Sequence, residues 1–143
     1  MSTCNSSNVE SCLYFTANSL TRYLNKLADE AFKMTGIPPA YAYVMLVILD
    51  DPGLNQHKIG KRMNLEASTV TRFIEKLLKM GLIERKKEGR VVSVFPTEKG
   101  FEFKAIIEQS LNILHDLYTD KLGDEMAKKL SISIHSANEL LGK

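Results

Sequence analysis

Between Leu54 and Gly100 the spacing of apolar residues changes from helical to strand-like, and this change constrains the fold more than any other feature of the chain. Residues 56–63 predict a short helix. Residues 67–79 predict a second helix, whose apolar stripe comprises Val70, Phe73, Ile74, Leu77 and Leu78. Two short segments, at 82–85 and 91–95, then predict a pair of strands joined as a hairpin.

Residues with strong turn and cap preferences mark the ends of these elements. Asn55 is the expected N-cap of the first helix, and Gly81 is expected to end the second in a left-handed conformation. Gly89 is expected at positive φ in the hairpin turn. Pro96 cannot donate to a strand ladder and should close the second strand, after which Thr97 caps the next helix.

Long apolar helices flank this segment on both sides. Apolar residues step by three and four over 11–34, which predicts a helix there. The apolar run 40–49 predicts a buried helix opened by the two prolines before it. Two amphipathic helices are expected in 98–143, with a break near Gly123. The expected fold class is therefore mainly α with a small β-hairpin (α+β), as a single domain over residues 1–143.

The charge of the chain is unevenly distributed. The net charge is only +2, but residues 56–104 contain twelve Lys or Arg and six Asp or Glu, a local net of +6. Cations gathered in one segment are the expected footprint of a polyanionic partner, although a solvated mixed-charge surface has a similar composition.

The longest apolar run is too short to cross a bilayer, and the polar N-terminus does not resemble a secretory signal. We therefore expect a cytoplasmic protein with no membrane partner and a frayed N-terminal tail.

The second helix of the pair has an exposed face suited to the major groove of DNA. Small hydroxyl groups at the start of a helix, with cations behind them, can reach base edges and phosphates. Arg72 can bond bidentately to a guanine or to a phosphate, and the sequence leaves this choice open. The residues expected to contact DNA from this face are Ser68, Thr69, Thr71, Arg72 and Lys76.

The hairpin adds further cations, and its tip is expected at 86–90. Arg90 is suited to entering a minor groove, where the negative potential is enhanced, and Glu88 can orient its guanidinium group. Phosphate contacts are expected to come from Lys58, Lys76, Lys86 and Lys87, and Arg85 is a further expected DNA contact.

From Leu65 to Gly100 the chain resembles the winged-helix core of the MarR family of bacterial transcription regulators. The likeness rests on Ser68-Thr69-Val70-Thr71-Arg72, on Lys79-Met80-Gly81-Leu82-Ile83-Glu84-Arg85, and on Glu88-Gly89-Arg90 followed by Pro96-Thr97-Glu98-Lys99-Gly100. The order and lengths of the predicted helices extend the likeness over nearly the whole chain. Glu88 and Pro96 stand where the family usually has aspartate and leucine, and the hairpin tip is shorter than usual.

The resemblance implies a homodimer that binds double-stranded DNA at a palindromic operator, most often as a repressor. It implies an N-terminal dimerisation helix with a flexible tail (1–36), a winged helix-turn-helix DNA-binding lobe (37–100) and C-terminal dimerisation helices (101–143). The apolar faces of the flanking helices are consistent with a dimer, because they carry more apolar surface than one small winged helix needs to cover its own core. The alternative is a winged-helix protein-interaction module whose basic hairpin meets an acidic protein.

The family commonly responds to oxidants, to small phenolic ligands or to metals, and the first two effectors have candidate residues here. Cys12 lies at the start of the first helix, whose N-terminus would lower its thiol pKa, and Cys4 is a conceivable resolving thiol. The alternative is that Cys12 is a small buried residue in a dimer interface. The candidates for an aromatic-ligand pocket, which are equally compatible with core packing, are Tyr14, Phe15, Tyr41 and Tyr43.

Metal and enzyme sites have little support in the sequence. The three histidines, His57, His115 and His135, lie on different predicted helices without a chelating spacing, so no metal site is predicted. The chain has no phosphate-binding glycine loop and no nucleophile elbow. We therefore expect no enzymatic activity and no cofactor.

Overall fold

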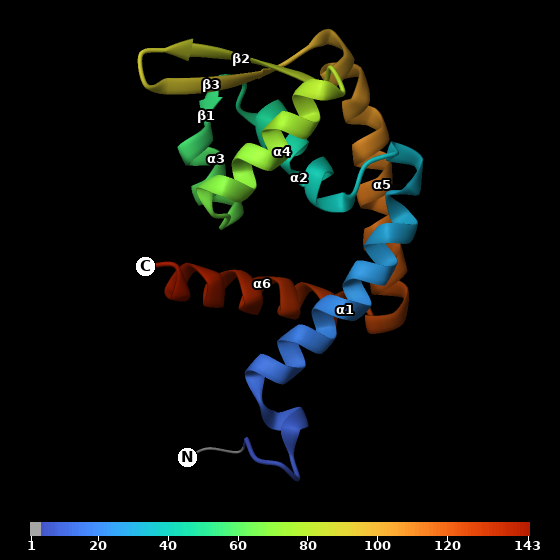
Figure 1. Cartoon of the computed structure of the whole chain (residues 1–143). Helices are drawn as coiled ribbons and strands as arrows, with labels where there is room; N and C mark the ends of the chain where they lie inside the picture. Colours follow the sequence, from blue (N-terminus) through green and yellow to red (C-terminus); the bar gives the residue numbers. More distant parts are fainter. Residues whose placement is uncertain (1–3) are drawn as a thin grey trace.

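The computed structural model describes residues 4–143 and consists mainly of helices, with one small antiparallel sheet (Figure 1). The helices are α1 (Leu13–Ala31), α2 (Pro39–Asp50), α3 (Gln56–Met63), α4 (Ala67–Lys79), α5 (Glu98–Leu122) and α6 (Asp124–Leu141). Two 3-10 turns, η1 (Val9–Ser11) and η2 (Lys33–Thr35), flank α1. The strands are β1 (Leu54–Asn55), β2 (Ile83–Glu88) and β3 (Val91–Pro96). The predicted fold class is confirmed; of the expected N-terminal tail, residues 1–3 lie outside the described range.

The caps and breaks expected from the sequence are present. Asn55 Oδ1 accepts a hydrogen bond from the backbone N–H of Lys58 at 2.9 Å, and Thr97 Oγ1 accepts one from the N–H of Gly100 at 3.1 Å. Gly81 has a φ of +72°. α1 is shorter than the predicted 11–34, because Cys12 is its extended N-cap and the backbone leaves the helical conformation at Phe32.

The sheet differs from the prediction in two respects. β1 pairs with β3, so the strand order is β1-β3-β2; a strand of two residues is too short to leave a periodic signal. The hairpin ladder also runs farther than predicted, since Glu88 pairs with Val91. The tip is therefore the turn Gly89–Arg90, with positive φ only at the glycine, as in a type II′ turn, and not 86–90.

The hydrophobic core is centred on α2, as its apolar sequence predicted. Ala42, Val44, Met45 and Ile48 are completely buried. α3, α4 and β3 pack on one side of α2, and α5 packs on the other (Figure 1). These elements form a lobe from which β2, β3 and their turn, here called the wing, project.

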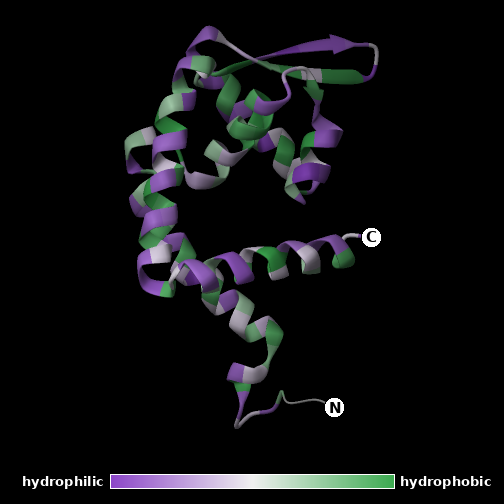
Figure 2. Ribbon diagram, turned by 180° about the vertical axis from the view of Figure 1, so that it is seen from behind, coloured by the Kyte–Doolittle hydropathy of each residue, from purple (hydrophilic) through white to green (hydrophobic). Residues whose placement is uncertain are grey.

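α1, α5 and α6 form a second part of the molecule, away from the wing. α1 packs against α5, and α6 turns away after Gly123 and runs below the lobe (Figure 1). No residue of α6 is buried, and hydrophobic residues recur along it (Figure 2). Its exposed large apolar side chains are Met126, Ile132, Ile134, Leu140 and Leu141. Among the described residues, no helix combines the length and apolar character needed to cross a membrane.

Candidate nucleic-acid interface

A tight turn between α3 and α4 fixes the angle of the two helices. Asn64 ends α3 in the left-handed region, at a φ of 56°, which asparagine tolerates better than most residues. Gly60 allows the helices to approach closely, because a Cβ there would lie 3.1 Å from the carbonyl oxygen of Leu65 and 3.2 Å from Cγ2 of Val70. The geometry is that of a helix-turn-helix, with α4 as its second helix.

α4 separates an apolar face from a polar one. Its buried residues are Val70, Ile74 and Leu77. The opposite stripe, at positions i, i+4, i+7 and i+11, comprises Ser68, Arg72, Glu75 and Lys79. Of the residues expected to contact DNA from α4, four are exposed (Ser68, Thr71, Arg72 and Lys76), and Thr69 is half-buried.

The hydroxyl of Thr71 is partly engaged within the helix. Thr71 Oγ1 donates to the carbonyl oxygen of Ala67 at 3.0 Å, so the lone pairs of the hydroxyl remain available as acceptors. Arg72 is exposed, and its guanidinium group makes no ion pair with any described residue. Arg72 therefore retains its full donor capacity for a partner outside the protein.

The pairing register of β2 and β3 places the cations of the wing on two different faces of the hairpin. Residues directly opposite each other share a face of the sheet, so Arg85 and Lys87 lie on the face of buried Val94, while Lys86 lies on the other. Lys86 Nζ lies 5.0 Å from the ring centroid of Phe95 on that other face. Arg90 is exposed in the turn at the end of the wing.

Arg85 is bound to another side chain of the protein. Its Nη1 atom donates to Oε1 of Glu75 at 2.8 Å, which joins β2 to α4. This pair was not foreseen, because the two residues lie ten positions apart in different elements. A second ion pair of the same kind joins Arg62 of α3 to Asp50 of α2, at 2.9 Å.

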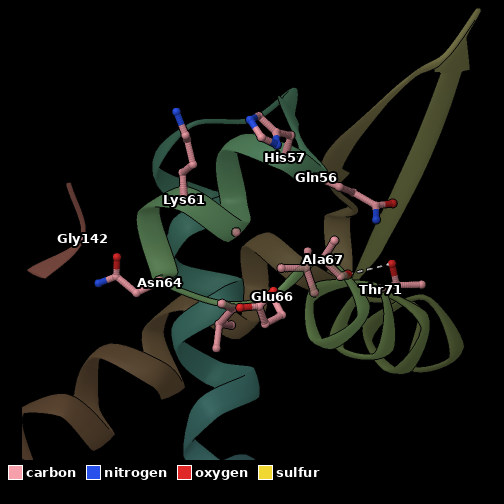
Figure 3. A pocket seen from close by; sticks show the side chains of 11 residues that line it. Gln56, His57, Lys61, Asn64, Glu66, Ala67, Thr71 and Gly142 are labelled. Carbon is pink, nitrogen blue, oxygen red and sulfur yellow. Dashed lines mark hydrogen bonds between the residues drawn. The ribbon is translucent and has the colours of Figure 1, made fainter.

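A hollow of about 530 Å³ lies between α3 and the start of α4 (Figure 3). In this view Gln56 and Thr71 lie on one side of the hollow, and Asn64 and Gly142 lie on the other. Lys58, which was expected to contact phosphate, is exposed on α3. Three other residues of α3 line the hollow and were not among the predicted DNA contacts: Gln56, His57 and Lys61. His57, Lys58 and Lys61 are all exposed on the short basic helix α3, a signal that was available from the sequence.

The prediction that the helix N-terminus lowers the thiol pKa of Cys12 is wrong. A side-chain hydrogen bond with Cys4, followed by desolvation, raises the thiol pKa of Cys12 above its ordinary value. The direction of the pKa shift is therefore opposite to that expected at a helix N-terminus, because the contact with the second thiol favours the protonated form. Cys12 is half-buried and Cys4 is exposed.

The four aromatic candidates do not form one cluster within a single chain. Tyr41 packs on Phe73 with ring centroids 4.5 Å apart, and Tyr43 packs on Phe32 with centroids 6.0 Å apart. Tyr14 and Phe15 are 84% and 41% exposed at the other end of α1. Eighteen residues of helix separate Tyr14 from Phe32, which is about 27 Å at about 1.5 Å per residue.

Tyr43 has a second neighbour that the sequence did not indicate. Burial raises the pKa of the Tyr43 hydroxyl, and Tyr118 of α5 raises it further. The ring of Tyr118 lies 5.4 Å from that of His115, measured between centroids. Tyr43 of α2 and Tyr118 of α5 are thus close enough to interact electrostatically. Within residues 4–143, no three metal-ligating side chains gather at one place.

Comparison with known proteins gives a consistent picture. The model of the MarR family matches residues 42–90. The chain is 26% identical over 84 residues to the uncharacterised HTH-type transcriptional regulator YybA of Bacillus subtilis, covering 57% of the chain and 56% of that relative. It is 29% identical over 112 residues to the HTH-type transcriptional regulator SarZ of Staphylococcus aureus, covering 73% of the chain and 72% of SarZ.

Solved structures with low sequence identity share the fold. A MarR protein from Peptoclostridium difficile superposes with a TM-score of 0.79 at 20% identity, over 99% of this chain and 92% of the other. A MarR family regulator from Listeria monocytogenes, complexed with a 26-mer DNA, gives 0.76 at 20% identity, over 91% and 89%. The regulator PcaV from Streptomyces coelicolor, in complex with its natural ligand, gives 0.79 at 20% identity, over 96% and 98%.

Proposed function

Because the chain belongs to the MarR family of transcriptional regulators, which are DNA-binding proteins rather than enzymes, we propose that it acts as a homodimeric repressor of a palindromic operator. Such a protein works in the cytoplasm, where the DNA lies. The observation that carries the proposal is the exposed polar stripe of α4 beside a wing that ends in Arg90. In this proposal α4 enters the major groove and Arg90 enters the neighbouring minor groove.

The exposed apolar side chains of α1 and α6 support the homodimer. An amphipathic helix without a buried residue gains little from its own chain, and contiguous exposed apolar surface marks an interaction site. A two-fold dimer would cover this surface and would set two copies of α4 about 34 Å apart, one turn of the duplex. The three parts proposed from the sequence (1–36, 37–100 and 101–143) then serve as dimerisation, DNA-binding and dimerisation segments.

The salt dependence of binding tests the proposed function. A duplex selected by the protein from a random pool should bind with an affinity whose logarithm falls linearly with the logarithm of salt concentration, by about 0.9 for each phosphate neutralised. Fluorescence anisotropy at several salt concentrations measures this slope, with a scrambled duplex as the control. A flat response without sequence preference would instead favour the protein-interaction module.

We propose a small aromatic molecule as the effector, in preference to thiol oxidation. Tyr43 is partly exposed, packs on Phe32 and interacts electrostatically with Tyr118. These residues offer aromatic faces and hydroxyl groups near the junction of α2 and α5. A ligand bound there would bias the separation of the two lobes in a dimer by population shift. Support for oxidation is weaker because the pKa of the Cys12 thiol is raised.

The contact between the thiols gives a separate prediction. Cys4→Ala removes the hydrogen bond that favours the protonated thiol, so the pKa of Cys12 should fall. A pKa lower by one raises the thiolate fraction about tenfold at a pH below the pKa. Alkylation of Cys12 by iodoacetamide near neutral pH, followed by mass spectrometry, should therefore be faster in Cys4→Ala than in the wild type. Cys4→Ser keeps a hydrogen-bonding group and should accelerate it less; equal rates in all three proteins would exclude the contact.

A further inference from the structure

We propose that the ion pair between Glu75 and Arg85 is a clamp that fixes the angle between α4 and the wing. Both residues then act as positioning residues for Arg90, and Arg85 is not a phosphate contact. The inference deepens the proposed function of the α4–wing surface and rests on it for its DNA-binding consequences.

The clamp lies where the wing leaves the lobe. Arg85 faces the same side of the sheet as buried Val94, and its Nη1 atom reaches Oε1 of Glu75 at 2.8 Å. On the other edge, β1 supports β3 only as far as Ser93. Within the described part of the chain, no residue in 86–92 is buried, so the outer wing lacks a core of its own. The pair is therefore the anchor of the β2 edge, three residues and about 10 Å, at about 3.4 Å per residue, before the turn that holds Arg90.

The charge of Glu75 gives the pair a second consequence. Glu75 is the only acidic residue in the sequence of α4, and it shares the exposed stripe with Ser68, Arg72 and Lys79. An unpaired carboxylate there would repel the phosphates that this stripe is proposed to meet. Arg85 neutralises the carboxylate of Glu75. Because its guanidinium group is engaged in this pair, it does not contact DNA in the proposal.

Two substitutions at one position separate the clamp from a charge effect. Glu75→Ala and Glu75→Gln both remove the negative charge, but only glutamine keeps an oxygen that can accept from Arg85. If charge alone mattered, both variants should bind the selected duplex more tightly than the wild type. The clamp predicts that Glu75→Gln binds at least as tightly as the wild type, whereas Glu75→Ala binds about two- to fivefold more weakly, the range measured for single exposed ion pairs.

The wing itself reports on the clamp in the free protein. Backbone amides of residues 86–92 should exchange with deuterium faster in Glu75→Ala than in Glu75→Gln, because the outer wing is then held only by its own ladder. Asp50→Ala opens the ion pair that joins α2 to α3 through Arg62, and it should leave wing exchange unchanged. Both alanine and glutamine are good helix formers, so α4 should stay intact, which the circular dichroism and the melting temperature will check.

Coupling to Arg90 completes the experiment. Arg90→Ala should weaken binding less in the Glu75→Ala background than in the wild type, and it should keep its full effect in the Asp50→Ala background. Equal binding by Glu75→Ala and Glu75→Gln, or equal wing exchange in the two, would overturn the clamp. A wild type that prefers no duplex would overturn the proposed function instead, while wing exchange would still decide whether the clamp exists.

Discussion

Gly100→Ala is expected to destabilise the protein by about 2–4 kcal/mol, because a side chain there has no space. Gly100 is the third residue of α5 and is buried. A Cβ atom would collide with the backbone carbonyl oxygen of Leu82 and would lie 3.2 Å from Cε of Met45. The carbonyl cannot move freely, since it accepts the N–H of Thr97 at 3.1 Å and Leu82 is itself completely buried.

The measurement is thermal or urea unfolding at one fixed protein concentration, because association would make the melting temperature depend on concentration. Gly36→Ala is the matched control. It places the same methyl group at a φ of +72° with no atom within 4 Å, so only backbone strain of about 1 kcal/mol is expected. If the two variants unfold alike, the close approach of α5 to Leu82 does not limit stability.

Much of the lobe was predictable because its signals are local. The bounds of α3 and α4 were expected at 56–63 and 67–79 and are found there. Asn55 and Thr97 cap their helices through contacts three residues away, and such contacts are encoded in the adjoining sequence. The buried position of α2 follows from its nearly uninterrupted apolar run.

The features that the sequence did not reveal depend on contacts between distant residues. β1 exists because Leu54 meets Val94, and the hairpin tip is short because the ladder continues through Lys87 to Glu88. A run of charged residues has low strand propensity, so only pairing with β3 explains the added length of β2. The pairing of Arg85 with Glu75 and the raised pKa of Cys12 likewise arise from partners that no spacing rule indicated.

Charging the apolar stripe of α6 is expected to separate the homodimer and to weaken binding to a palindromic duplex by about 10²–10⁴, the gain that a second linked site usually contributes. Ile134 and Leu141 lie seven residues apart on one face of α6 and are 43% and 82% exposed in a single chain. In the proposed dimer both would be buried, so the double variant Ile134→Glu with Leu141→Glu would place two carboxylates in an apolar interface. Within one chain position 141 is largely in water and position 134 is partly exposed, so the fold of the monomer should persist.

Sedimentation velocity measures the mass of the species, circular dichroism its helix content, and anisotropy its affinity for the selected duplex. Ser136→Glu adds a carboxylate to an exposed position on the side of α6 away from Ile134 and Leu141, and, compared with the single variant Ile134→Glu, it should leave both mass and affinity unchanged. A charged-stripe variant that stays dimeric would place the interface elsewhere. A monomeric variant that retains full affinity would contradict the palindrome, because the spacing of two α4 helices along one face of the duplex is the only reason the dimer is needed for binding.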